Sequence, residues 1–296
     1  MIEVKNLVKS FDGFRALDGL NISVPKGAVY GLVGPNGAGK STAIRHLAGI
    51  YRQDSGEVLT DGEPVYENTR IKEITAYIPD DIFYYTQATV SDMMRFYKSI
   101  YPRFSADRYE RLGEALNIDA SRPMRKLSKG MQKQVAFRLA LSLCPEYVIL
   151  DEPFDGLDPV MRRQVWNILL ADVEQNETTI LVSSHNLREL EDVCDHVGIM
   201  NKGKMLLEHS LSELQDNMAK IQLLPGEKEL PKDLDIINET SAGRIKQLII
   251  RGKPDRIAEK IAAADPVYMD TLPLSLEEIF IYELGGADRE IKNIIL

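Results

Sequence analysis

The sequence has few cysteines and no long hydrophobic run. Only Cys144 and Cys194 occur among its 296 residues, and both stand in apolar surroundings. That usage is typical of reduced, buried thiols rather than of disulfides or a metal site. No run approaches the roughly 18 apolar residues of a membrane-spanning helix. The first residues, MIEVKNLVKSF, also lack the apolar stretch of a signal peptide. We therefore expect a soluble, cytosolic chain.

Basic residues are outnumbered by acidic ones. The sequence holds 36 Lys and Arg against 45 Asp and Glu, a formal net charge of −9. This balance disfavours a broad nucleic-acid-binding face, because neutralising phosphates requires clustered Lys and Arg. Hydrophobic residues make up 44% of the chain. With this length, that content supports one large domain or two modest ones.

The hydrophobic pattern changes three times along the chain. Residues 1–78 favour short strands separated by Asp-Gly and Lys-Gly turns. Residues from about 80 to 145 carry apolar side chains at spacings of three and four, which predicts a helical insert. YVILDEP and TTILVSSH then predict buried strands, each followed by a helical segment, as in a parallel sheet. Residues 216–296 alternate between strand and helix patterns, which indicates a small separate α/β appendage.

The segment GPNGAGKS fits the phosphate-loop pattern G-x-x-x-x-G-K-[ST], with an apolar strand before it and a helical run after it. Its glycines let backbone N–H groups turn toward phosphates, Lys40 reaches the β and γ phosphates, and Ser41 offers a hydroxyl to Mg²⁺. We expect a nucleoside triphosphate here. The expected nucleotide contacts in this segment are Gly34, Pro35, Asn36, Gly37, Ala38, Gly39, Lys40, Ser41 and Thr42.

Two further strands end in residues suited to the same chemistry. YVILDE ends in Asp151, which is placed to hold Mg²⁺, and Glu152, which can orient or deprotonate an attacking water. TILVSSH ends in His185, which we expect to contact the γ-phosphate. Parallel strands deliver their carboxyl ends to one edge of the sheet, so these residues should meet the phosphate loop there.

A segment without acid or base, LSKGMQKQ, lies between the phosphate loop and Asp151. Ser128 is placed to cap a helix whose free N–H groups form an anion site, and Gly130 permits close approach. The order of these motifs resembles that of ATP-binding-cassette (ABC) ATPases over roughly residues 1–215. LSKGM stands where that family has its signature, LSGGQ.

The resemblance implies an ABC-type P-loop NTPase fold: a mixed sheet core, an antiparallel β subdomain and a helical subdomain at about residues 80–145. It also implies that Phe11 stacks on adenine and that His185 is the switch histidine. Two chains would pair head to tail, so that Ser128 and Gly130 contact the γ-phosphate held by the partner subunit. Asp158, in GLDP, is expected at the dimer seam.

Two departures from the family pattern concern the signature and the strand ending TAYIP. Lys129 and Met131 replace a glycine and the glutamine of the usual signature, and Asp80 stands where the family commonly has a glutamine that touches Mg²⁺. A carboxylate can still approach Mg²⁺ from there, so we count Asp80 as a further possible ligand. These features are similar to the ATPases of bacterial antibiotic and bacitracin exporters.

The resemblance implies ATP and Mg²⁺ as ligands and two protein partners. One is a second ATPase subunit, identical or homologous, and the other is a separate multi-span permease that holds the chain at the inner face of the cell membrane. The alternative is a soluble ABC clamp on ribosomes or DNA, which the acidic charge and the single cassette disfavour. A cassette that binds ATP without hydrolysing it is disfavoured because both Glu152 and His185 are present.

Aromatic residues are concentrated after Asp80. They have two interpretations: the core of the helical subdomain, or an exposed groove that receives a cytoplasmic helix of the permease. The residues concerned are Phe83, Tyr84, Tyr85, Phe96, Tyr97 and Tyr101.

Overall fold

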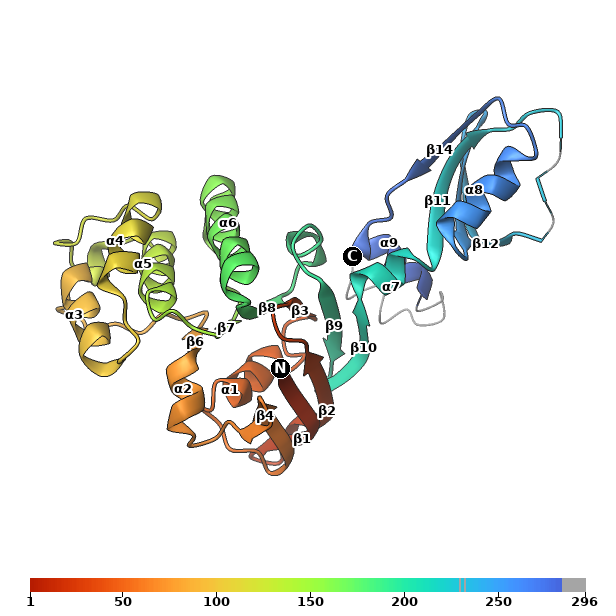
Figure 1. Ribbon diagram of the computed structural model, residues 1–296. Helices are drawn as coiled ribbons and strands as arrows, with labels where there is room; N and C mark the ends of the chain where they lie inside the picture. The colour runs from red at the N-terminus through yellow and green to blue at the C-terminus, as the bar shows by residue number, and fades with distance from the viewer. Residues whose placement is uncertain (229, 232, 284–296) are drawn as a thin grey trace. The chain divides into compact units, whose positions relative to one another are not determined.

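The computed structural model describes residues 1–228, 230–231 and 233–283, which fold into two compact units (Figure 1). The first unit comprises Met1–His185 and His196–Glu208. The second comprises Asn186–Asp195 and the described residues from His209 onward. The chain therefore leaves the first unit directly after His185 and returns to it at His196.

The first unit opens with an antiparallel sheet in the order β2-β1-β4-β5. Asp12 and Gly13 connect β1 to β2 with φ values of 46° and 84°, and such a two-residue Asp-Gly turn matches the twist of a hairpin. Apolar residues of this sheet join the core around the phosphate loop. The strands are β1 (Ile2–Phe11), β2 (Phe14–Val24), β4 (Ser55–Thr60) and β5 (Glu63–Pro64).

A second sheet, in the order β10-β9-β3-β8-β7-β6, forms the centre of the first unit. β3 pairs in parallel with β8 and β9, and β7 pairs in parallel with β6 and β8. Every residue of β3, β7 and β8 is buried, as expected for parallel strands covered on both faces. The strands are β3 (Val29–Val33), β6 (Thr75–Ile78), β7 (Tyr147–Leu150), β8 (Thr179–Ser184), β9 (His196–Asn201) and β10 (Lys204–Ser210).

Helices α3, α4 and α5 form the predicted helical subdomain, which has its own apolar core (Figure 1). The Thr89 side chain accepts from the Asp92 N–H and the Asp92 carboxylate accepts from the Thr89 N–H, a capping box that begins α3. The helices of the first unit are α1 (Lys40–Leu47), α2 (Thr69–Ile74), α3 (Val90–Ile100), α4 (Ala106–Ala115), η1 (Met124–Lys126), α5 (Lys129–Leu141) and α6 (Pro159–Asn176).

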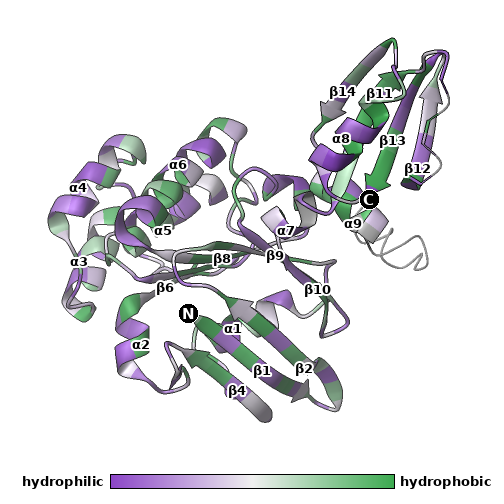
Figure 2. Ribbon diagram, turned by 45° about the vertical axis from the view of Figure 1, so that its right-hand side comes forward, coloured by the Kyte–Doolittle hydropathy of each residue, from purple (hydrophilic) through white to green (hydrophobic). Residues whose placement is uncertain are grey.

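The second unit is built on an antiparallel sheet in the order β12-β13-β11-β14. Ile257 and Ile261 of α8 pack on apolar residues of β11 and β13, whose ribbons are largely hydrophobic in Figure 2. The elements are η2 (Leu187–Glu189), α7 (Leu211–Gln215), β11 (Met218–Leu224), β12 (Asp235–Ala242), β13 (Ile245–Arg251), α8 (Pro254–Ala262), β14 (Tyr268–Leu272) and α9 (Leu276–Glu283).

The fold confirms the expected α/β core with an antiparallel β subdomain and a helical subdomain, and it differs from the sequence analysis in three details. Residues 1–78 contain α2, whose first turn is capped by the side chain of Asn68. The strand β12 was not anticipated, because most of its residues are exposed and lack alternation. The helix expected after β8 is only the 3₁₀ turn η2, because Asn186–Asp195 packs with the second unit.

Candidate functional site

The phosphate loop connects β3 to α1 at the carboxyl edge of the central sheet. Gly39 precedes α1 with φ of 104° and Gly37 has φ of 81°, a left-handed conformation that favours glycine. A Cβ on Gly34 would lie 2.3 Å from the carbonyl oxygen of Met200 on β9. These glycines are therefore required by the turn of the loop and by its close packing on the neighbouring strand.

Lys40 is the first residue of α1 and is 5% exposed. Its Nζ donates to the carbonyl of Gly34 at 2.6 Å and lies 3.2 Å from Oε1 of Glu152. A buried ammonium requires such partners, because desolvation is costly for an unpaired charge. The loop lysine and the predicted general base are thus in direct contact.

Asp151 follows β7 and is 2% exposed. Its Oδ1 accepts hydrogen bonds from Ser41 Oγ at 3.0 Å and from Ser183 Oγ at 2.9 Å. Burial raises the pKa of Asp151, while the bonds from Ser183 and Ser41 oppose that rise. A carboxylate and a hydroxyl oxygen in contact are a donor set that suits Mg²⁺, a hard cation that prefers oxygen ligands.

Glu152 has a left-handed backbone with φ of 45°. Its N–H donates to Ser183 Oγ at 3.0 Å, and its carbonyl accepts from Nζ of Lys133 at 2.7 Å. Its carboxylate lies between Lys40 and His185, whose Nδ1 is 3.0 Å from Glu152 Oε2. The structure therefore brings Glu152 and His185 together beside the phosphate loop.

A cavity of about 310 Å³ covers the loop. Phe14, Ala16, Asp80 and Glu152 line it together with residues 35–42. Phe11, which was expected near the adenine, is not among the lining residues; it packs edge-on against Tyr51 with ring centroids 5.4 Å apart. Phe14 is 69% exposed and was missed in the sequence, where its place just after the turn of a hairpin carries no special signal.

The signature segment lies at the start of α5. Ser128 caps the helix, with its Oγ accepting from the Met131 N–H at 3.3 Å. A Cβ on Gly130 would lie 2.7 Å from the carbonyl oxygen of Gly156. Asp158 caps α6 by accepting from the N–H groups of Val160 and Met161. None of these three predicted partner-facing residues lines the phosphate-loop cavity of their own chain.

The chain was compared with known proteins. The ABC transporter family profile matches residues 17–155. The chain is 30% identical over 291 residues to the ABC transporter ATP-binding protein YtrB of Bacillus subtilis, covering 98% of this chain and 100% of YtrB. It is 34% identical over 224 residues to the daunorubicin/doxorubicin resistance ATP-binding protein DrrA of Streptomyces peucetius, covering 74% and 68% of the two chains.

The chain belongs to the ATP-binding proteins of ABC transporters. Solved structures agree: the ATP-binding subunit of an ABC transporter superposes with a TM-score of 0.67 at 28% identity, covering 73% of this chain and 92% of that one. CbiO1 of Clostridium perfringens, part of the transporter complex CbiONQ, superposes with a TM-score of 0.60 at 27% identity, covering 72% and 89%. As a member of this family, the chain is an ATPase that binds adenine nucleotides.

The sequence analysis gave no role to two residues that contact the backbone of Glu152 in this ABC ATPase. Lys133 lies in LSKGMQKQ and Ser183 in TILVSSH, but neither belongs to the positions that the motifs define.

Among the described residues, no helix combines the length and apolar character needed to cross a membrane. Both cysteines are free, Cys194 buried and Cys144 only half-buried.

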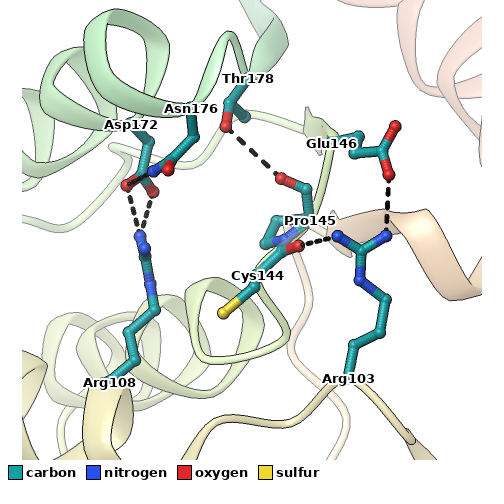
Figure 3. A pocket seen from close by; sticks show the side chains of 8 residues that line it. All are labelled: Arg103, Arg108, Cys144, Pro145, Glu146, Asp172, Asn176 and Thr178. Atoms are coloured by element: carbon teal, nitrogen blue, oxygen red, sulfur yellow. Dashed lines mark hydrogen bonds and ion pairs between the residues drawn. The ribbon is translucent and has the colours of Figure 1, made fainter.

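A second cavity, of about 260 Å³, lies at the amino end of β7, away from the carboxyl edge that carries the phosphate loop (Figure 3). Arg108 of α4 pairs there with both carboxylate oxygens of Asp172 on α6. Arg103 donates to Glu146 and to the carbonyl of Cys144. Both arginines are thus paired with carboxylates; Arg108 connects α4 to α6, and Arg103 contacts the residues just before β7 of the central sheet.

Proposed function

We propose that this ABC ATPase hydrolyses ATP to power a separate membrane permease, as a bacterial exporter. The observation that carries the hydrolytic part is the position of Glu152. Its carboxylate lies 3.2 Å from Lys40 and 3.0 Å from His185, beside a loop built for phosphate. A carboxylate so placed is within reach of a water attacking a γ-phosphate.

The residues of the loop bind the nucleotide. The backbone N–H groups of residues 36–41 and the positive end of α1 receive the phosphates, and Lys40 exchanges its contact with Gly34 for the β and γ phosphates. Phe11, which is 39% exposed and lies outside the lining of the cavity, remains the proposed contact of the adenine. Ser41 and Asp151, already in contact, hold Mg²⁺, and Asp80 is a further candidate ligand. When bound, Mg²⁺ neutralises charge on the phosphate oxygens.

Hydrolysis requires a water aligned with the γ-phosphate. Glu152 orients this water and accepts its proton, while His185 holds the Glu152 carboxylate through the 3.0 Å contact and reaches the γ-phosphate. Lys40, released from Glu152 by the phosphates, stabilises the charge that develops on them. The protein contributes position and electrostatics, which dominate catalysis of phosphoryl transfer.

Each site is completed by a second subunit. Ser128 and Gly130 begin a helix, so their N–H groups and the helix dipole offer an anion site to the partner's γ-phosphate. Asp158 lies at the seam. ATP therefore favours a closed pair and hydrolysis opens it, which is a population shift that a permease can convert into work.

A groove in the first unit is suited to a helix of the permease. A cavity of about 510 Å³ is lined by Tyr66, Tyr77, Tyr97 and Tyr101 with apolar residues that follow α1 and residues at the end of α5. Nearby along the chain, Phe83 and Tyr85 are 72% and 48% exposed; their rings are in edge-to-face contact, and Tyr85 makes a second such contact with Phe96. Exposed aromatic side chains are enriched in protein-binding surfaces.

Export is supported by the relatives, one of which is named for daunorubicin and doxorubicin resistance and another as a probable multidrug transporter protein of Escherichia coli.

We propose that residues 1–215 form the nucleotide-binding domain and residues 216–296 an accessory domain. The chain is placed at the inner face of the membrane by its permease, and nucleic acid is not a partner.

The test has two parts. Glu152→Gln should keep ATP affinity, trap a nucleotide-bound dimer visible by size exclusion, and lower ATP turnover by about 100-fold or more. Unchanged turnover would contradict the assignment of Glu152 as the base.

The second part tests the permease. The tagged chain, purified at native level in mild detergent, should bring down a multi-span protein. Recovery with ribosomes or DNA instead would overturn the transporter assignment.

A further inference from the structure

Lys133 is a buried lysine that lies in LSKGMQKQ, two residues beyond the LSKGM signature, and the proposed function gives it no role. It lies on α5, five residues after Ser128, and is 4% exposed. Lysine is almost never buried to this degree unless its charge is paired, because desolvating an ammonium is costly. The partners of Lys133 therefore indicate why it is there.

Those partners belong to the catalytic edge of the sheet. Lys133 Nζ donates to the backbone carbonyl of Glu152 at 2.7 Å, and it lies 3.5 Å from Oδ1 of Asp80. Asp80 follows β6 and also lines the phosphate-loop cavity. One ammonium thus connects the helix that begins with the signature, the residue after β6 and the backbone of the proposed base.

The backbone of Glu152 needs such support. Its φ of 45° is in the left-handed region, which is unfavourable for a residue that carries a Cβ. The Ser183 hydroxyl holds the N–H of Glu152 and Lys133 holds its carbonyl. With both ends of the residue fixed, its carboxylate is directed toward Lys40 and His185.

We propose that Lys133 is a positioning residue, which sets the backbone of Glu152 from the signature helix with Asp80 as its counter-ion. Lys133 and Ser128 belong to the same start of α5, so a displacement of this helix when Ser128 meets a partner's nucleotide moves the Glu152 carbonyl as well. The pair Asp80–Lys133 also accounts for a carboxylate at position 80. This inference rests on the proposed role of Glu152.

The test is Lys133→Met, which keeps the length of the side chain and removes its charge and donors. Asp80, 56% exposed on its side chain, stays solvated in this variant. We expect kcat for ATP to fall by about 100-fold, the effect of a misplacement near 1 Å, while the Kd of a fluorescent ATP analogue with Mg²⁺ stays within about twofold. Lys133→Arg, which keeps a donor and the charge, should recover part of the loss. Lys126→Met removes an exposed lysine nearby and is the matched control.

The outcomes separate this inference from the proposed function. If Glu152→Gln abolishes turnover but Lys133→Met turns over normally, the positioning role is wrong and the base assignment stands. If Glu152→Gln turns over normally, the base assignment itself fails. A rise in Kd that accounts for the whole loss in Lys133→Met would make the residue a binding residue and overturn the proposal. Should Lys133→Met not fold, Lys133→Gln takes its place with the same expected split between kcat and Kd.

Discussion

Ser183 shows how one side chain can bind two neighbouring residues of the proposed catalytic site. Its hydroxyl donates to Asp151 Oδ1 at 2.9 Å and accepts the N–H of Glu152 at 3.0 Å, and it is fully buried. Ser183→Ala leaves that buried N–H without a partner, which costs about 1–3 kcal/mol. We expect lower stability in urea and slower ATP turnover. Ser99→Ala, an exposed serine on α3, is the control, and equal turnover in the two variants would contradict the role of the hydroxyl.

Gly130 is constrained within a single chain as well as by its proposed role in a dimer. An added Cβ would lie 2.7 Å from the Gly156 carbonyl oxygen, and relief of such a contact costs about 1–3 kcal/mol. We expect Gly130→Ala to lower the melting temperature of the nucleotide-free monomer. Ser128→Ala removes only a helix cap, a loss of about 1 kcal/mol, so it is the cleaner variant for testing contact with a partner's nucleotide. A Gly130→Ala monomer as stable as the wild type would contradict this expectation, because it would show that the loop after β7 moves away from the added methyl group without loss of stability.

At the scale of elements, α4 and α6 are connected by the ion pair shown in Figure 3. Asp172 is 6% exposed and accepts from Arg108 at both carboxylate oxygens and, at 3.4 Å, from Nδ2 of Asn176, so Arg108 is the cation that balances its charge. Arg108→Met would leave a buried carboxylate unpaired, and breaking a buried pair in this way costs about 3–5 kcal/mol.

Urea unfolding of Arg108→Met, compared with a double variant, checks this expectation. The double change Arg108→Met with Asp172→Leu removes the stranded charge, so it should recover most of the lost stability. If the single and double variants unfold at the same urea concentration, the pair contributes packing rather than charge compensation.

At the scale of the whole molecule, the chain passes from its first unit to its second directly after His185. Asn186–Asp195 follows His185 and belongs to the second unit. Within that unit, Arg188 donates twice to Glu277 of α9, and Glu191 accepts from the backbone N–H of Leu276. The segment that follows His185 is therefore held by contacts within the second unit.

The stability of this second unit should depend on pH through Glu278 of α9. Burial acts to raise the pKa of Glu278, but bonds from Lys220 and Ser275 outweigh it, so the pKa lies below its ordinary value of 4.5. The unfolded state therefore binds the proton more readily, and the stabilisation is present above pH 4.5 and is lost as the pH falls through the lowered pKa.

Hydrogen exchange of the β11 and α9 amides measures this effect. At pH 7 these amides should exchange faster in Glu278→Gln than in the wild type, and the difference should shrink as the pH is lowered past 4.5. A difference independent of pH would assign the effect to packing instead of to charge.

The local sequence determined those features that depend on residues close together in the chain. Short motifs predicted the phosphate loop, the two acidic residues after β7 and the capping serine of α5. The apolar pattern of the segments predicted the buried parallel strands. Local sterics and hydrogen bonding enforce both kinds of signal. The family and the cassette fold followed from the order of these motifs, and the α/β appendage was predicted from the strand and helix patterns after residue 215. The boundary at 215–216 and the roles of the site residues stay predictions.

Only the tertiary structure decided which residues from distant segments meet. Lys133 and Ser183 reach the backbone of Glu152 from 19 and 31 residues away along the chain. Residues after His185 join α9, 89 residues later in the case of Arg188 and Glu277. Such contacts follow from the packing of whole elements, and no local spacing encodes them because each partner is chosen by the fold rather than by its neighbours in sequence.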